Sequence, residues 1–262
     1  MDYEGFLQEL PGLYHDWGTA TVRPRSDRFQ AVLQRVRGMT TANVLQLLNA
    51  AVAHLEPDES YCEIGCFQGA TLIGALLDQP ERRAYAADNF SEFDAAGQNQ
   101  RLLLENLAAF ALGPSVRFAN QDFEDYFRSL RTSPPQVGVY LYDGAHDYRS
   151  QLLGLLLAVP FLAKRALLVV DDSNCPTVQQ ATWDFMAVRP ECRLLLELPT
   201  PCNGHPSFWN GVFVLGWDSA SHNGYSSDTF RRGRQAKLLE SLDVLQQFNF
   251  HLAGNTLQAT PV

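Results

Sequence analysis

The sequence has little cysteine, and what it has suits neither a disulfide framework nor a zinc site. The five cysteines are an odd number and lie scattered between Cys62 and Cys202. Cys62 and Cys66 are four residues apart, but no second close pair follows at the spacing of zinc ligands. We therefore expect reduced thiols in a cytoplasmic protein.

The chain also lacks a long apolar run. The longest stretch, Leu152 to Leu162, contains Gly154 and Pro160 and is far too short to span a bilayer. The first residues, MDYEGFLQEL, include acidic side chains where a signal peptide would have basic ones, and they contain no apolar core region. These absences predict a protein that acts without a membrane.

Positive charge is scarce. Lysine and arginine number 20 against 29 aspartates and glutamates, so the net charge is -9, and Arg231, Arg232 and Arg234 form the one basic cluster. An acidic chain repels a phosphate backbone, so we expect a small-molecule partner rather than nucleic acid. The apolar fraction of 46% is ordinary for a chain that buries a core.

Short apolar runs alternate with helix-period segments from residue 40 onward. The first helix has an N-cap at Thr40 or Thr41 and ends before Pro57. Further helices are expected at 70–77, 98–110, 148–162 and 177–188. Strands are expected at 60–64, 84–87, 116–119, 137–142, 166–170, 193–198 and 212–215.

This alternation predicts an α/β fold, a Rossmann-like seven-stranded sheet that is mostly parallel with helices on both faces. No helix pattern separates the last two strands, so they should form an antiparallel hairpin at one edge. We expect residues 40–262 to form one domain with a helical tail near Gln235 to Phe248. Residues 1–39, rich in aromatics, should fold over the carboxyl end of the sheet or into a homodimer contact.

A loop with two glycines follows the first expected strand and reads EIGCFQGAT over residues 63–71. Gly65 and Gly69 permit a tight turn and close backbone approach to a ligand. Asp88 ends the second strand 23 residues after Gly65, where a carboxylate would hold the hydroxyls of a ribose. A dinucleotide site would read G-x-G-x-x-G, which this loop does not. A glycine-rich turn without a ligand is the alternative.

The pattern E-x-G-x-x-x-G-x-T resembles the first motif of class I methyltransferases that use S-adenosylmethionine. The stretches ADNFSEF at 87–93, YLYDGAHDY at 140–148 and LVVDDSN at 168–174 resemble strand-end signatures of one branch. That branch contains macrocin and related O-methyltransferases and the cephalosporin-hydroxylase-like proteins. The resemblance covers residues 40–216, and it departs at Lys164-Arg165-Ala166, where most relatives have a Gly-Gly turn before strand five.

The resemblance implies that S-adenosylmethionine lies across the first three strand ends. The amino-acid and ribose parts would be held near Gly65 and Asp88, and the adenine near Asp122. Asp122 could equally be the N-cap of the next helix, or serve both purposes. The implied cofactor residues are Glu63, Gly65, Gly69, Thr71, Asp88, Asn89, Phe90, Gln121 and Asp122.

Three aspartates stand at the next two strand ends. Asp143 is 28 and 29 residues from Asp171 and Asp172, the span of one helical crossover. Neighbouring carboxylates repel unless a cation or protons intervene, and oxygen ligands without clustered Cys or His suit Mg²⁺, Mn²⁺ or Ca²⁺. By resemblance the trio holds a divalent metal, most simply Mg²⁺, that acidifies the acceptor hydroxyl. Alternatively, Asp171 caps a turn and Asp172 is solvated.

His146 lies three residues beyond Asp143, and these two are the expected catalytic residues. A neutral imidazole can accept the acceptor's proton during methyl transfer, although a helix-capping or ring-stacking role is the alternative. The loop from Pro199 to Asn210 could form a lid over the acceptor, and Trp17 could contribute, or both could simply pack on the surface.

The sequence thus predicts metal-assisted O-methylation of a small molecule, with a sugar hydroxyl, a phenol and a polyketide alcohol all open. Two alternatives remain. One is a metal-independent N- or C-methyltransferase, and the other is a non-catalytic nucleoside-binding domain on the same fold.

Overall fold

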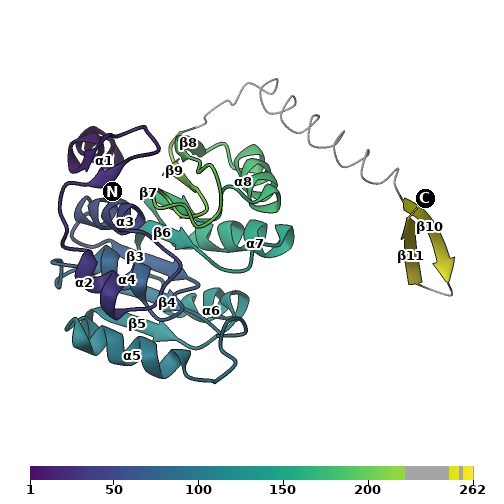
Figure 1. Ribbon diagram of the computed structural model, residues 1–262, viewed down its shortest axis with the longest axis horizontal. Helices are drawn as coiled ribbons and strands as arrows, with labels where there is room; N and C mark the ends of the chain where they lie inside the picture. The colour runs from purple at the N-terminus through teal and green to yellow at the C-terminus, as the bar shows by residue number, and fades with distance from the viewer. Residues whose placement is uncertain (222–247, 254–255, 262) are drawn as a thin grey trace. The chain divides into compact units, whose positions relative to one another are not determined.

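Seven strands form one sheet in the order β5-β4-β3-β6-β7-β9-β8 (Figure 1). Strands β3 to β7 run parallel, and β9 pairs antiparallel with both β7 and β8. The expected α/β fold with an antiparallel edge is therefore confirmed. The strands are β3 (Ser60–Ile64), β4 (Ala84–Ala87), β5 (Val116–Ala119), β6 (Val137–Tyr142), β7 (Leu162–Val170), β8 (Cys192–Leu198) and β9 (Val212–Asp218).

This computed structural model describes residues 1–221, 248–253 and 256–261. The chain divides into two compact units, Met1–His222 and Asn223–Val262. Of the second unit, the described residues form an antiparallel hairpin of β10 (Phe248–Ala253) and β11 (Thr256–Pro261) that the sequence pattern did not reveal. The expected helical tail lies outside the described residues except for Phe248, which begins β10.

The helices lie on the two sides of the sheet (Figure 1). Right-handed crossovers between parallel strands produce this arrangement, because the chain runs outward from β3 to β5 and then returns to β6. On one side are α3 (Ala42–Ala53), α4 (Ala70–Leu76) and α5 (Asn99–Ala109), and on the other are α6 (Phe123–Leu130), α7 (Tyr148–Ala158) and α8 (Pro176–Val188).

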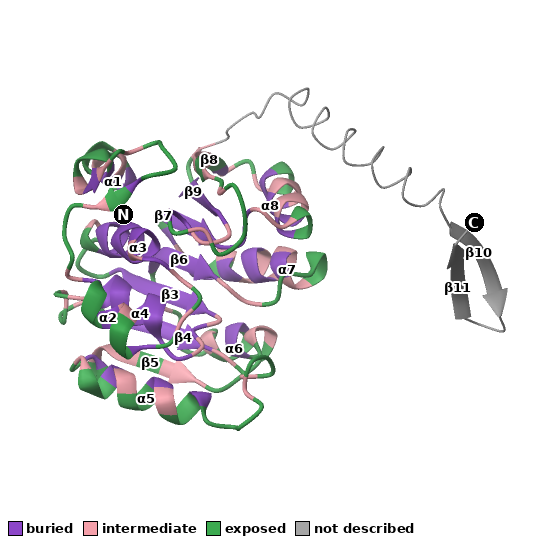
Figure 2. Cartoon of the chain, viewed as in Figure 1, coloured by how far each residue is buried: buried purple, intermediate pink, exposed green. Residues whose placement is uncertain are grey.

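The strand order reverses between β3 and β6, which are neighbours in space although β4 and β5 come between them in sequence. In an open α/β sheet, ligands bind beyond the carboxyl ends of the strands at such a point. The central strands are buried, whereas the edge strands β5 and β8 are partly exposed (Figure 2). The strand-order reversal therefore lies in the buried centre of the sheet.

The helix α3 begins at the expected N-cap, since the Thr41 side chain accepts a hydrogen bond from the backbone N–H of Val44. Every residue from Asn43 to Val52 is buried. A helix buried all round needs cover on its outer side. The N-terminal segment supplies that cover.

That segment has more regular structure than its sequence indicated: α1 (Tyr3–Glu9), the 3-10 turn η1 (Leu10–Leu13), the short strands β1 (Tyr14–His15) and β2 (Arg23–Pro24), and α2 (Gln30–Arg35). Phe6, Leu10 and Phe29 are buried in one core cluster with the residues of α3. The Tyr14 hydroxyl donates to the backbone oxygen of Asn43 at 2.9 Å. The segment is thus part of the domain's own core.

The boundary between α7 and β7 differs from the prediction. The helix ends at Ala158, a 3-10 turn η3 (Val159–Phe161) follows, and β7 begins at Leu162 rather than at Ala166. Pro160 cannot continue the helix, because it lacks the N–H donor. Arg165, expected in a loop, lies in β7, where its guanidinium stacks over the Tyr3 ring at 4.1 Å and pairs with Glu4.

No helix in the described part of the chain is long and apolar enough to cross a membrane.

Candidate active site

A cavity of about 450 Å³ opens where strands β3 to β7 end, at the predicted crevice. Its volume falls within the range of small-molecule sites. Most of the residues predicted for the cofactor, the metal and catalysis line it: Gly65, Thr71, Asp88, Asn89, Gln121, Asp122, Asp143, His146, Asp171 and Asp172. Glu63, Gly69 and Phe90 do not.

Gly65 lets the tips of β3 and β6 come together. Its φ is +86°, and a Cβ there would collide with the backbone carbonyl oxygen of Asp143. Its N–H donates to Ala87 at 2.9 Å, while the N–H of Asp143 donates to Ile64 at 2.9 Å. At the point where strand order reverses, the backbone is therefore hydrogen-bonded to the neighbouring strands on both sides. Gly65 presents no side chain to the cavity, so a ligand can approach the backbone closely.

Gly69 serves the turn rather than the cavity. It is the N-cap of α4 with φ +91°, and a Cβ would lie 2.7 Å from the Leu103 side chain. Gly69 does not line the cavity, and the structure gives it a packing role. Glycine is needed there because other residues rarely adopt a positive φ.

Glu63 lies beneath the loop and is fully buried. Tyr61 donates its hydroxyl to one carboxyl oxygen and Thr71 donates to the other, both at 2.6 Å. Burial raises the pKa of Glu63 to about 7, although these two hydrogen bonds lower it. Both carboxyl oxygens accept hydrogen bonds from neighbouring side chains, and Glu63 does not line the cavity. Glu63 instead orients Thr71, which lines the cavity.

Asp88 ties two loops together at the end of β4. Its carboxylate accepts the backbone N–H groups of Phe67 and Phe90, each at 2.7 Å. Burial raises the pKa of Asp88, and these amide hydrogen bonds oppose the rise. Each carboxylate oxygen has a second lone pair, so Asp88 can still accept hydroxyl groups. Phe90 packs its ring 5.8 Å from Phe118 and takes part through its backbone alone.

Asp122 caps a helix and also lines the cavity. It is the N-cap of α6 and accepts the N–H of Glu124 at 2.9 Å. Its other oxygen lies 3.5 Å from the Asn89 amide nitrogen, and with Gln121 it lines the cavity. Capping therefore fixes the side chain at the cavity wall.

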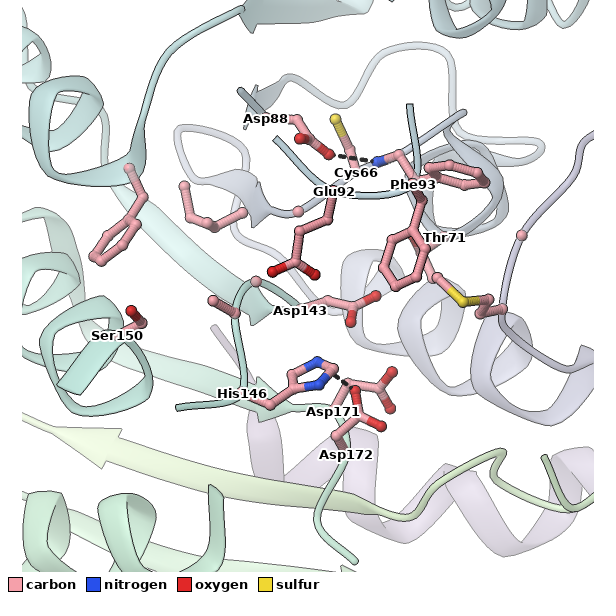
Figure 3. A pocket seen from close by; sticks show the side chains of 18 of the residues that line it. Cys66, Thr71, Asp88, Glu92, Phe93, Asp143, His146, Ser150, Asp171 and Asp172 are labelled. Carbon is pink, nitrogen blue, oxygen red and sulfur yellow. Dashed lines mark hydrogen bonds and ion pairs between the residues drawn. The ribbon is translucent and has the colours of Figure 1, made fainter. Parts of the chain in front are cut away.

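Asp143, Asp171 and Asp172 meet at the adjacent tips of β6 and β7 (Figure 3). Burial and the neighbouring aspartates raise the pKa of Asp143 well above its usual range, and burial followed by Asp172 raises that of Asp171 to about 8. Among the described residues, the Oδ1 atom of Asp171 is buried without a hydrogen-bond partner. Asp172 has a φ of +56°, a region that side chains rarely adopt and that often marks functional sites.

His146 approaches Asp172 rather than standing apart from the acids. Its Nε2 lies 2.7 Å from Asp172 Oδ2, and the Asn210 amide donates to Asp172 Oδ1. The hydrogen bond with Asp172 raises the pKa of His146. One possible ligand atom from each of Asp143, His146 and Asp172 lies within 4.8 Å of the others.

This group differs from the predicted trio, with His146 in place of Asp171. Two carboxylates and an imidazole fit a divalent cation, and the orphaned Asp171 oxygen lines the same cavity. Sequence reasoning assigned His146 to proton transfer, with helix capping or ring stacking as the alternative, and did not count it among the metal ligands. The short spacing from Asp143 to His146 was the signal that both belong to one loop.

Two stretches that sequence reasoning did not assign to the site also line the cavity, residues 38–40 before α3 and residues 91–93 after β4. The loop between β8 and β9, which was considered as a lid, contributes Asn203, Trp209 and Asn210. The expected lid is therefore present only in part. Phe208 turns away to pack 6.3 Å from the rings of Tyr14 and Trp17, so Trp17 supports the loop and does not line the cavity.

The loop between β8 and β9 is held on α3. The Thr41 hydroxyl and the Asn43 amide both donate to the backbone oxygen of Ser207, at 2.7 and 2.9 Å. His205 bonds to the Ser207 hydroxyl at 2.6 Å. These contacts join segments far apart in sequence, which explains why no local pattern revealed them.

Residues 62–173 match the family described as a methyltransferase domain. The matched stretch begins in β3 and ends just beyond β7, so it spans both the Asp88 side and the Asp172 side of the cavity. No curated protein sequence matches the chain.

Several solved structures share the fold. A candidate O-methyltransferase from Klebsiella pneumoniae superposes with a TM-score of 0.57 at 17% identity, over 75% of this chain and 92% of that one. The O-methyltransferase TomG of Streptomyces achromogenes, in complex with SAM, gives 0.56 at 14% identity, over 84% and 100%. An O-methyltransferase from Bacillus cereus, in complex with SAH, gives 0.53 at 11%, over 74% and 92%.

At these identities the likeness shows the fold. The activity comes from the family match, which identifies the stretch that carries the cavity as a methyltransferase domain.

Proposed function

We propose that the enzyme transfers a methyl group from S-adenosylmethionine to a hydroxyl oxygen of a small molecule, with help from a divalent cation, most simply Mg²⁺. The observation that carries the proposal is that one cavity holds both Asp88, beside the bare Gly65 backbone, and the group of Asp143, His146 and Asp172. Donor and acceptor bound in one cavity can be aligned for in-line displacement.

The donor half lies at β3 to β5. Asp88 keeps a free lone pair on each oxygen and would accept the two ribose hydroxyls. Asp122 and Gln121 would face the adenine, and the Gly65 backbone and Thr71 would face the amino-acid part. The predicted roles of Glu63, Gly69 and Phe90 become indirect, since they hold these loops in place.

The acceptor half lies at β6 and β7. An ionised Asp172 can only accept hydrogen bonds, so a neutral His146 donates its Nε2–H to it and keeps the lone pair on Nδ1. That lone pair would take the hydroxyl proton as the acceptor oxygen bonds to the methyl carbon. The carbon–sulfur bond breaks at the same time, and its electron pair goes to sulfur. General-base assistance of this kind contributes about 10²–10⁴-fold.

The cation would be held by Asp143 and Asp172, with Asp171 as third ligand because its Oδ1 has no partner among the described residues. A cation bound there acidifies and orients the acceptor hydroxyl. It would also relieve the repulsion among the three carboxylates. The 4.8 Å grouping favours a second arrangement, in which His146 is the third ligand and not the base.

Three measurements test the proposal. Calorimetry should show S-adenosylmethionine binding in the low micromolar range or tighter, about -8 kcal/mol. Chelation should abolish methyl transfer but leave donor binding intact, because the donor contacts lie at β3 to β5. Calorimetric titration with Mn²⁺ should show weaker binding to Asp171→Asn but not to His146→Ala, and the reverse result would support the second arrangement.

Full activity in excess chelator would instead support a metal-independent N- or C-methyltransferase. Donor binding without turnover on any acceptor would support a non-catalytic domain.

We further propose that the enzyme belongs with the macrocin-like branch, on the Asp143-Gly-x-His146 and Asp171-Asp172 motifs. It would act in the cytoplasm, where its five free cysteines would stay reduced. A homodimer contact through residues 1–39 also stays a prediction, which sedimentation can test.

A further inference from the structure

One acidic side chain in the cavity has no part in the proposed function on which this inference rests. Glu92 follows β4, and its carboxylate projects into the cavity between Asp88 and Asp143 (Figure 3). Glu92 is exposed, and among the described residues no hydrogen bond or ion pair reaches its carboxylate. A carboxylate without a partner in a binding cavity is available to a ligand.

The cavity as a whole is acidic. Six carboxylates line it and no lysine or arginine does: Asp88, Glu92, Asp122, Asp143, Asp171 and Asp172. Two arginines lie near it: Arg37 stacks 5.8 Å from the ring of Phe67, at the rim of the cavity, and Arg149 pairs with Glu124 at 2.8 Å. His146 is the one basic side chain in the wall, and it is paired with Asp172.

A bound donor and cation would not neutralise this wall. The donor's sulfonium and ammonium groups are partly offset by its own carboxylate, so donor and divalent cation bring fewer positive charges than the cavity has carboxylates. An acceptor bearing phosphate, a nucleotide diphosphate or a coenzyme A thioester would enter against a net negative field. The chain's net charge of -9 adds to that repulsion.

A second feature shows that the acidic wall is open to a ligand. Asp171 is only 9% exposed, yet its Oδ1 has no hydrogen-bond partner among the described residues. Buried polar atoms are normally paired, so an unpaired one in a cavity wall indicates a group that arrives with the ligands. In the proposed function that group is the cation, which leaves Glu92 for the acceptor.

Apolar surface accompanies this charge. Phe93 is 67% exposed and Met39 is 46% exposed, and both line the cavity with Trp209. Ligand cavities are lined largely by apolar and aromatic side chains, and these three offer such a surface to a ligand. The acceptor should therefore have an apolar or ring-shaped body.

We infer that the methyl acceptor is a hydroxylated, ring-containing compound that carries an ammonium group and no anionic group, and that Glu92 pairs with that ammonium. Glu92 is thus the residue that determines specificity for charge. Figure 3 shows Glu92 on the Asp88 side of Asp143 and the pair of His146 and Asp172 on the other side, so the ammonium would lie away from the Asp172 group. Rejection of anionic acceptors follows from the same wall by repulsion.

The test uses three catechols that share a vicinal diol and differ in charge: dopamine, 4-methylcatechol and 3,4-dihydroxyphenylacetate. The rate constant kcat/KM is measured for each with S-adenosylmethionine and Mg²⁺. The Kd is measured by calorimetry on enzyme loaded with S-adenosylhomocysteine and Mg²⁺. Dopamine should exceed 4-methylcatechol by about tenfold, and the anionic probe should fall about tenfold lower still, as expected for partly solvated charge pairs.

Glu92→Gln should lower dopamine to the level of 4-methylcatechol and leave the neutral probe unchanged. The matched control is Glu81→Gln, on an exposed turn outside the cavity, which should leave all three probes unchanged. Thermal unfolding of both variants checks that they fold.

Equal binding or turnover of the anionic and cationic probes would overturn the inference, as would failure of every probe to bind at millimolar concentration. A third outcome would also overturn the inference: Glu92→Gln binds the methyl donor more weakly, but the ratios of kcat/KM between the three probes stay the same. Glu92 would then contact the donor and not the acceptor. The proposed function fails separately, by absent donor binding or by turnover that ignores chelation.

Discussion

Replacing Glu63 by glutamine should change how the stability of the folded enzyme depends on pH. Glu63 is fully buried, and burial raises its pKa from an ordinary 4.5 to about 7 against the hydrogen bonds of Thr71 and Tyr61. The folded state therefore favours the protonated acid. Its stabilising contribution is complete below pH 4.5 and is lost as the pH rises through about 7.

The size of the effect follows from that shift. One pKa unit corresponds to about 1.4 kcal/mol, so ionising Glu63 removes about 3 kcal/mol of unfolding free energy between pH 4.5 and pH 8. Glutamine cannot ionise, but its amide cannot accept from both hydroxyls, which costs about 1 kcal/mol at every pH. Glu63→Gln should therefore be less stable than the wild type by about 1 kcal/mol at low pH and more stable by about 2 kcal/mol above neutrality.

Urea unfolding followed by circular dichroism at about pH 5, 6, 7 and 8 measures this crossing. Comparing the variant with the wild type cancels the other titrating groups, including Asp143 and Asp171. Glu105→Gln, an exposed carboxyl that pairs with Arg101, serves as control and should show no crossing. Parallel curves for Glu63→Gln and the wild type across this range would refute the reasoning, since they require an ordinary pKa at Glu63.

Three further predictions concern the cofactor, the acceptor side and the core. Asp88→Ala should weaken donor binding by about 1.5–3 kcal/mol in calorimetry, because it removes charge-accepted hydrogen bonds, and unchanged affinity would rule out the ribose contact. Asn210→Ala should lower kcat with donor Kd unchanged, because Asp172 loses the donor that holds it; equal kcat would make Asn210 a loop residue only. Phe6→Ala should lower the unfolding free energy by about 3–5 kcal/mol, since the ring is fully buried, whereas a change below about 1 kcal/mol would show that residues 1–39 are dispensable.

The order of strands and helices, and the chemistry at the strand ends, could be predicted from the sequence. Apolar runs of strand length and apolar residues at helical spacing are local patterns, so β3 and β4 are found where they were predicted. The polar residues that follow such strands must gather at one edge of a parallel sheet. For that reason the sequence alone could predict that Asp88, Asp143 and Asp172 line one cavity, although it did not show which side chains surround them.

Only the tertiary structure decided which way each side chain faces and what it meets. Glu63 belongs to the same motif as Gly65, yet it turns beneath the loop because Tyr61 and Thr71 bind its oxygens. The sequence by itself determined that an acid stands at each strand end. The pairing of His146 with Asp172, held by Asn210 from a loop 38 residues away, depends on packing between distant segments. Such contacts leave no period in the sequence, because a side chain's partner is set by where other parts of the chain fold.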